Sequence, residues 1–227
     1  MSLHAPVPPS SGVGDVDARC HRLAQRFDAV RGRSAALAAP IGAEDAMVQS
    51  MADASPTKWH LAHTTWFFER FVLADGGPYT PFDPAWDYLF NSYYQSAGPM
   101  HARPQRGVLS RPTLAQVSDY RDAIETRMRA RLQRGDLDAR LLDIVELGLQ
   151  HEQQHQELLL TDIKHAFFSN PLHPAYRDDL PQAGGSAAAL GWIARQESIC
   201  EVGHAAWPGD AGFAYDNESP RHRVLVP

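Results

Sequence analysis

The longest helical pattern in the sequence carries two histidines in its apolar stripe, and this feature constrains the fold most. Apolar side chains recur at helical spacing over about residues 138–169, and His151 and His155 fall on the same stripe. Residues four apart lie one above the other on a helix, so both imidazoles should face the interior. Buried imidazole nitrogens need hydrogen-bond partners or a cation. The pattern predicts a helical fold packed around a polar centre.

Three other segments have the periodicity of helices. They are residues 15–36, residues 56–73, which open with Ser55-Pro56, and residues 113–135, which open with a capping-box pattern. Four helices with apolar stripes predict a four-helix bundle, and we assign it to residues 15–180. The stretch 1–14 is rich in proline, serine and glycine and is expected to be disordered.

The composition changes after residue 170. Glycine, alanine and serine dominate residues 181–192, which we interpret as a linker. Short strand-like segments follow at residues 199–202 and 223–226, so residues 193–227 are expected to be the incomplete start of a β-containing domain. The predicted fold class is therefore mainly α, a helical bundle followed by a few strands.

Charge and composition exclude several function classes. The chain has 21 lysines and arginines against 27 acidic residues, a net charge of -6 that provides no basic field for nucleic acid. No apolar run reaches the ~18 residues of a membrane span. Cys20 and Cys200 lie far apart in the sequence and form neither a metal motif nor a disulfide framework, so a reducing cytoplasm is expected.

The second helical segment supplies another histidine pair. His63 shares a face with Trp59 and Trp66 that should turn inward, whereas His60 falls about 60° away on the outer side of that face. We interpret His60 as a surface histidine or a group behind the ligands. His63 would complete a three-histidine site with His151 and His155. Three neutral ligands leave positions open on a metal ion, which is typical of catalytic sites.

The same stretch also satisfies the HExxH pattern of zinc proteases, in which Glu152 would be the general base. This pattern is short, and no third ligand stands at a protease spacing. We therefore expect Glu152 to orient a ligand or to face solvent.

The connection over residues 79–111 is too long for a simple turn and is expected to carry function. Arg103 and Arg106 lie in it beside Pro104 and Gly107. Arginine binds carboxylates with two parallel hydrogen bonds, so the pair is a candidate for substrate recognition. Asn91-Ser-Tyr-Tyr94 could line the same cavity.

Several blocks occur in a characteristic order: Ser55 to Glu69, Tyr93-Tyr94, His101 to Gly107 and His151 to Glu157. Together they resemble the signature blocks of the ergothioneine-biosynthesis sulfoxide synthases, the iron-dependent EgtB family. The resemblance covers about residues 33–227, and residues 213–224 look like the first strands of that family's second domain. It implies a DinB-like four-helix bundle followed by the truncated first strands of a formylglycine-generating-enzyme-like, C-type-lectin-like α+β domain.

The resemblance also implies a reaction. Members of that family are non-haem Fe(II) enzymes that use O2 to join hercynine to γ-glutamylcysteine or cysteine, giving a sulfoxide. Three histidines on an octahedral ion leave room for a substrate imidazole, a thiolate and O2. By motif, the family's Fe(II) ligands match His63, His151 and His155. A glutamine that contacts the hercynine ring matches Gln154, and the arginine pair that holds the thiol's carboxylate matches Arg103 and Arg106.

Family members continue well past residue 227, and their catalytic tyrosine lies in the second domain, so this chain alone is expected to be inactive. Two other hypotheses stay open. A stand-alone DinB-type thiol transferase would hold zinc or nickel in the same three-histidine site. A metal-stabilised bundle could also serve as a binding module without catalysis.

Overall fold

The computed structural model describes residues 13–92, 98–179, 184–205 and 212–227. The chain divides into two compact units, residues 1–177 and residues 178–227. Most of the segment expected to be disordered, together with Tyr93, Tyr94 and part of the expected linker, lies outside the described residues.

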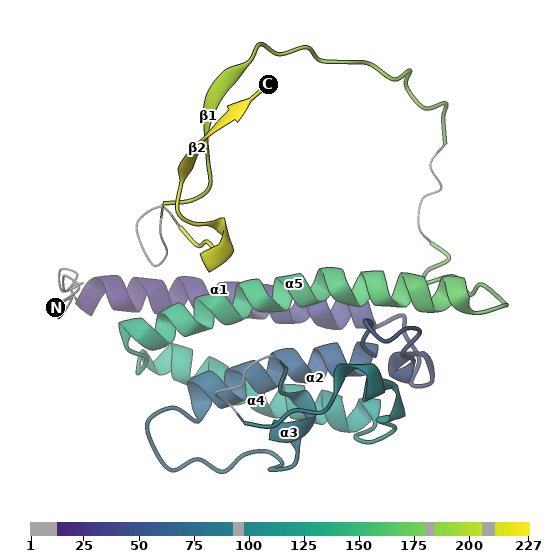
Figure 1. Ribbon diagram of the computed structural model, residues 1–227. Coiled ribbons are helices and arrows are strands. Elements are labelled where there is room, and N and C mark those ends of the chain that lie inside the picture. The colour runs from purple at the N-terminus through teal and green to yellow at the C-terminus, as the bar shows by residue number, and fades with distance from the viewer. Residues whose placement is uncertain (1–12, 93–97, 180–183, 206–211) are drawn as a thin grey trace. The chain divides into compact units, whose positions relative to one another are not determined.

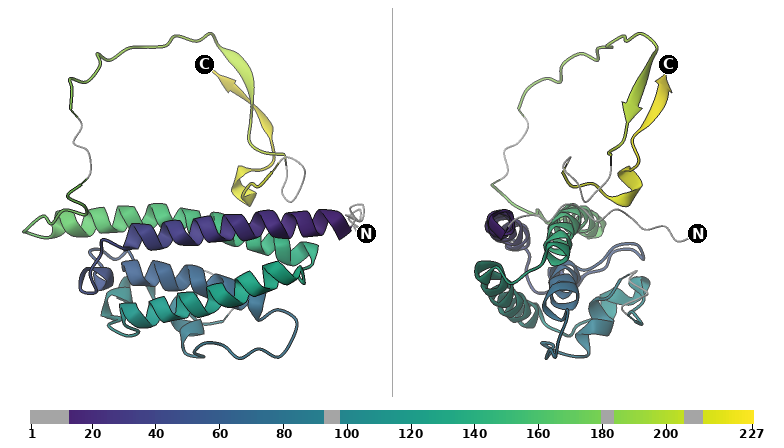
Figure 2. Two further views of the ribbon diagram at one scale, coloured as in Figure 1. Left: turned by 180° about the vertical axis from the view of Figure 1, so that it is seen from behind. Right: turned by 90° about the vertical axis from the view of Figure 1, so that its left-hand side faces the viewer.

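The first unit is a bundle of four long helices, as the periodicity predicts (Figure 1). The view along the helices in Figure 2 shows them in cross-section. Their bounds are α1 (Val13–Ala38), α2 (Thr57–Phe68), α4 (Leu114–Arg134) and α5 (Ala139–Ser169).

The boundaries of α4 and α5 follow local chemistry. Thr113 and Gln116 form the predicted capping box at the start of α4, and Gly135 ends this helix in the left-handed conformation with φ of 65°. The Asp138 side chain accepts a hydrogen bond from the Leu141 backbone N–H and so caps α5.

Helices α1 and α5 run side by side (Figures 1 and 2). The apolar stripe of α1, including Leu23 and Phe27, lies in the core. Arg19 and Arg26 add ion pairs to α5, because Arg19 contacts Asp143 and both arginines contact Glu146.

Helix α2 is the centre of the bundle, since all of its residues from Thr57 to Phe68 are buried. A helix that is buried all round has neighbours on every side, so it has no solvent face. The predicted helix extends to residue 73, but the structure changes to a π-helical turn, η2 (Glu69–Leu73), where the Ala74 N–H donates to the Glu69 carbonyl.

Helices α2 and α5 approach closely at Gly148. A Cβ atom at this position would lie 2.7 Å from ring carbons of both Phe67 and Phe68. Glycine is therefore required for this contact, which lies one turn before His151.

The long connection between α2 and α4 contains helical segments that its irregular sequence does not predict. They are α3 (Trp86–Phe90) and the 3-10 segment η4 (Arg103–Val108); a further 3-10 turn, η1 (Asp45–Met47), precedes α2. Trp86 and Phe90 are buried in the same core as the long helices. This packing folds the connection onto the bundle.

The second unit contains an antiparallel pair, β1 (Ser198–Val202) and β2 (His222–Val226), with the 3-10 turn η5 (Asp216–Glu218) between them. Ser198 pairs with Val226, and Val202 pairs with His222. The two short strands match the sequence prediction. A lectin-like domain built on them stays a prediction.

Within the described ranges, no helix has both the length and the apolar character needed to cross a membrane.

Candidate metal centre

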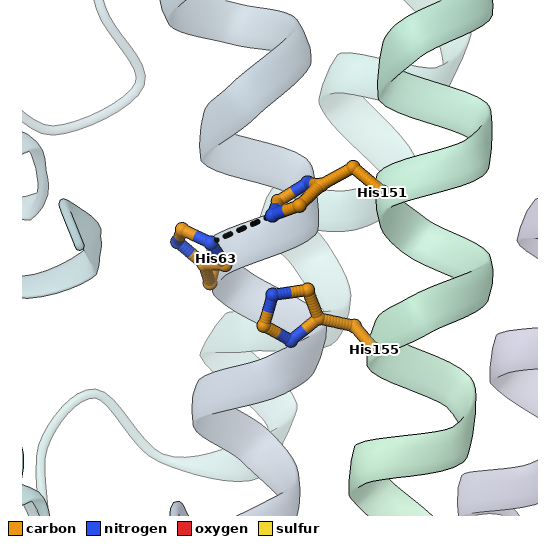
Figure 3. Close-up of side chains that lie close together, drawn as sticks. All are labelled: His63, His151 and His155. Atoms are coloured by element: carbon orange, nitrogen blue, oxygen red, sulfur yellow. Dashed lines mark hydrogen bonds between the residues drawn. The ribbon is translucent and has the colours of Figure 1, made fainter. Parts of the chain in front are cut away.

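Three histidines from two helices converge inside the bundle. His63 comes from α2, and His151 and His155 come from successive turns of α5 (Figure 3). One nitrogen of each ring lies within 4.8 Å of those of the other two. His63 is buried, and the α5 histidines are partly buried. The residues proposed from the sequence as metal ligands are therefore together in space.

The orientation of His63 is fixed from two sides. Its Nδ1 lies 2.6 Å from the Phe90 carbonyl oxygen, which can only accept, so Nδ1 carries the proton and Nε2 is bare. The Trp59 ring stacks on His63 at 4.6 Å with an interplanar angle of 12°. His63 Nε2 then faces His151 Nε2 at 3.2 Å.

His155 has a partner of its own. Its Nδ1 lies 2.9 Å from His60 Nδ1, and His60 Nε2 lies 3.0 Å from the Asp162 carboxylate. The interpretation of His60 as a surface histidine is wrong, because its side chain is buried. The expected outer position of His60 holds only for a helix with one buried side, whereas α2 is surrounded by protein. The other interpretation, a group behind the ligands, fits its contact with His155.

Burial keeps these rings neutral. It lowers the pKa of His63 well below the usual value, with a further contribution from nearby His151. Burial also lowers the pKa of His151 to about 4 and the pKa values of His155 and His60. Metal binding requires neutral imidazoles, so protons compete weakly with a cation at neutral pH.

The donor set fits a divalent transition metal. Imidazole nitrogen is a common ligand for iron, zinc and nickel. Two nitrogens at right angles on one ion, each ~2.1 Å from it, lie ~3 Å apart, which is close to the 3.2 Å between His63 and His151. Three histidines leave other positions on such an ion open, which is typical of reactive rather than structural sites.

Glu152 neither orients a ligand nor faces solvent, so the sequence interpretation is wrong. Its buried carboxylate contacts Arg31 at 3.0 Å and Arg121 at 3.4 Å, and it accepts a hydrogen bond from Ser34. Burial alone would raise the pKa of Glu152, but the two guanidinium groups outweigh it and hold the pKa below its usual value. A carboxylate engaged in this way is unsuited to the general-base role of the HExxH pattern.

The arginine-bearing segment η4 lies against the same centre. Arg106 is buried, its guanidinium carbon is 3.4 Å from the centroid of the Trp59 ring, and it donates to Ser55 and Ser92. Trp59 stacks in turn on His63. Arg106 therefore also has a packing role, because it stacks on an aromatic ring and uses both Nη atoms in hydrogen bonds.

Gln49 holds the segment in place. Its side chain donates to the Arg103 carbonyl at 2.7 Å and accepts from the Gly107 N–H at 2.6 Å. A Cβ at Gly107 would lie 2.9 Å from the Gln49 Cβ, so the close approach needs glycine. Arg103, half-buried, begins the segment.

The fold and the histidine site agree with a comparison to known families. The DinB superfamily matches residues 26–159, which include all three converging histidines. The chain belongs to the DinB superfamily. This superfamily includes metal-dependent enzymes. No curated protein matches the chain.

Other expected residues of this DinB domain lie in different surroundings. Gln154 is exposed on α5, next to the partly buried His155. His101 Nε2 donates to the Gln105 carbonyl oxygen within the loop, and this partly buried residue is not among the three histidines of the cluster. Both residues come from blocks that the sequence singled out.

Two groups that hold the histidines were not predicted from the sequence, namely Phe90, which contacts His63, and Asp162, which contacts His60. Asp162 had a readable signal, since it lies seven residues after His155 on the same stripe and is a carboxylate among apolar positions. The Phe90 contribution is a backbone carbonyl, so no side-chain pattern could have indicated it.

Proposed function

We propose that this DinB domain holds Fe(II) and is the metal-binding part of a sulfoxide synthase of ergothioneine biosynthesis. The reaction joins hercynine to γ-glutamylcysteine or cysteine. A C–H bond of the imidazole and the S–H bond of the thiol break, C–S and S–O bonds form, and O2 supplies the sulfoxide oxygen and one water. The observation that carries the proposal is the convergence of three neutral histidines beside an arginine-bearing segment.

His63, His151 and His155 would hold the metal, which when bound supplies open positions where O2 and substrates react. The residues of the chain contribute orientation and exclusion of water. Trp59 covers one face of His63, and Arg106 stacks on the Trp59 ring. This layered wall keeps solvent from the buried side of the centre.

The arginine segment gives the site positive charge. Arg106 contributes to the lowered pKa values of His63 and His155, which places its charge close enough to act on them. We assign the thiol's carboxylate to Arg103 with Arg106, where the positive charge favours an anionic substrate. Gln154, exposed beside His155, is assigned to the hercynine ring.

The second candidate is a DinB-type thiol transferase with zinc or nickel. It is favoured by one observation: every proposed ligand lies within residues 26–159, so the superfamily domain alone contains the whole metal set. The two candidates differ in the number of substrates that reach the metal. A synthase must bind hercynine and the thiol together, whereas a transferase needs only the thiol at the metal.

The first experiment tests the ligands. The full chain and the His63→Ala, His151→Ala and His155→Ala variants are loaded with Fe(II) without oxygen, and bound metal is measured. We expect one equivalent in the wild type and a loss of at least about tenfold in affinity in each variant. His165→Ala is the matched control on α5, since His165 bonds Ser50 outside the cluster. Full occupancy in any ligand variant would remove that histidine from the set.

The second experiment tests the substrates. The chain is loaded with Co(II), and visible absorption is followed while hercynine and then γ-glutamylcysteine or cysteine are added. We expect a change on adding hercynine and a thiolate-to-metal band that forms while hercynine stays bound. A thiolate band with no response to hercynine would favour the transferase. Mass spectrometry of the Fe(II)-loaded chain with both substrates and O2 then searches for the sulfoxide.

A further inference from the structure

A hydrogen-bonded relay leads from the metal centre into the protein. His155 Nδ1 contacts His60 Nδ1 at 2.9 Å, and His60 Nε2 contacts the Asp162 carboxylate at 3.0 Å. The same Asp162 oxygen accepts the Ser55 backbone N–H at 2.8 Å. His60 and Asp162 are 3% and 9% exposed, so water does not replace these contacts. The relay joins α5 to α2 and back to α5.

The direction of each hydrogen bond in the relay follows from the carboxylate of Asp162 at its end. A carboxylate oxygen accepts hydrogen bonds, and this one accepts from Ser55 as well, so His60 donates to it through Nε2–H. A neutral imidazole has one N–H, which leaves His60 Nδ1 as an acceptor. The facing His155 Nδ1 must then be the donor. In neutral His155 the remaining nitrogen, Nε2, is bare.

We propose that His60 and Asp162 are positioning residues that fix His155 in the tautomer whose bare Nε2 points at the metal. Figure 3 shows one ring nitrogen of His155 directed toward the space between His63 and His151. A ligand histidine commonly donates its other N–H to a carboxylate or carbonyl. Here a second histidine stands between the ligand and the carboxylate.

The arrangement at His63 supports this inference. His63 donates its Nδ1–H to the Phe90 carbonyl and leaves its Nε2 bare. Two ligands from different helices therefore have the same proton arrangement, imposed by different partners. The relay also touches the arginine segment, since Arg106 donates to the Ser55 hydroxyl at 2.9 Å. The effect on metal affinity rests on the proposed metal centre. The tautomer of His155 does not, because it exists without metal.

Two measurements test the relay. Long-range proton–nitrogen NMR of the metal-free chain reports which nitrogen of His155 carries the proton. Titration with Co(II) alone, followed by visible absorption, gives the metal affinity. The variants are His60→Leu, which removes both bonds, and His60→Gln, whose amide accepts on one side and donates on the other as neutral imidazole does. His165→Leu is the control, because it breaks another α5 hydrogen bond away from the centre.

We expect the Nδ1–H tautomer of His155 in the wild type and in His60→Gln, and a mixture of tautomers in His60→Leu. Co(II) affinity should fall about 10- to 100-fold in His60→Leu, with His60→Gln and His165→Leu close to the wild type. An Nε2–H tautomer of His155 in the wild type would overturn the relay. So would equal affinities of His60→Leu and His60→Gln.

The two measurements distinguish failure of the proposed metal centre from failure of the relay. A wild-type chain that binds no Co(II) would contradict the metal centre, while the NMR measurement on the same metal-free chain would still decide the tautomer.

Discussion

Glu152 follows His151 in the chain, yet its carboxylate belongs to a buried ion-pair network and not to the histidine cluster. Successive residues on a helix point about 100° apart, so His151 faces α2 while Glu152 reaches Arg31 of α1 and Arg121 of α4. Two cations surround this buried anion, and Glu125 supplies a second negative charge through its contact with Arg31. The network joins three helices and balances its own charge.

Glu152→Ala should destabilise the protein strongly. The change leaves Arg31 and Arg121 buried without their shared partner, which costs about 3–5 kcal/mol of unfolding free energy. Denaturant unfolding monitored by circular dichroism measures the change. Glu157→Ala, on the exposed side of the same helix, should change stability by less than about 0.5 kcal/mol. A stable Glu152→Ala protein that lost only activity would indicate a catalytic role instead.

The pH dependence of stability in the wild type and in Glu152→Ala tests the same ion pairs. The pKa of Glu152 is depressed in the folded state, so its stabilising contribution is present above the unfolded value of ~4.3. It is lost as pH falls through the lower, folded-state pKa. The unfolding free energies of the wild type and Glu152→Ala should therefore converge as the solution is made more acidic.

At the scale of elements, the contact between α2 and α5 sets the geometry of the metal centre. The three histidines of this candidate centre come from these two helices, and Gly148 allows the Phe67 and Phe68 rings to lie against the α5 backbone. Any added atom at Gly148 must separate the helices or move the rings, because packed interiors have no spare volume.

Gly148→Ala should therefore lower both stability and metal affinity. The added Cβ would meet ring carbons at 2.7 Å, and overpacking of this kind costs about 1–3 kcal/mol. Thermal unfolding and Co(II) titration measure the two effects. Gly32→Ala is the matched control on α1, where nothing lies within 4 Å of the new Cβ, and it should stabilise the helix by roughly 0.5–1 kcal/mol. Unchanged Co(II) affinity in Gly148→Ala would show that the site tolerates helix displacement.

For the molecule as a whole, the buried core and the metal residues belong to the first unit. The hydrophobic core cluster lies entirely between Cys20 and Ile163, and Ala214 is the buried hydrophobic residue described in residues 178–227. The strands β1 and β2 bury little of their own surface. We therefore expect stability and the proposed metal binding to depend on the bundle.

A protein ending at residue 177 should fold and bind metal as the full chain does. We expect the same thermal midpoint and the same Co(II) affinity, because no described core residue or proposed ligand is removed. Differential scanning calorimetry of both proteins, with and without Co(II), measures this. A clear loss of affinity in the shorter protein would show that residues 178–227 contribute to the site.

The sequence by itself determined the helices and their inward residues. Helical periodicity located the four long helices, the Thr113 capping box marked the start of α4, and the spacing of His151 and His155 placed both on one face of α5. These features depend on interactions within a few residues, so they can be read without knowing the neighbours of a segment. The DinB superfamily match agrees with that helical reading.

Only the tertiary structure decided the surroundings of those residues. His60 was misplaced because its burial depends on how many helices surround α2, and Arg106 gained a packing role because the loop folds back onto Trp59. The proton arrangement of His63 depends on the carbonyl of Phe90, which is 27 residues away in the chain. Contacts of this kind join segments distant in sequence, and the local pattern of one segment contains no information about which segment will pack against it.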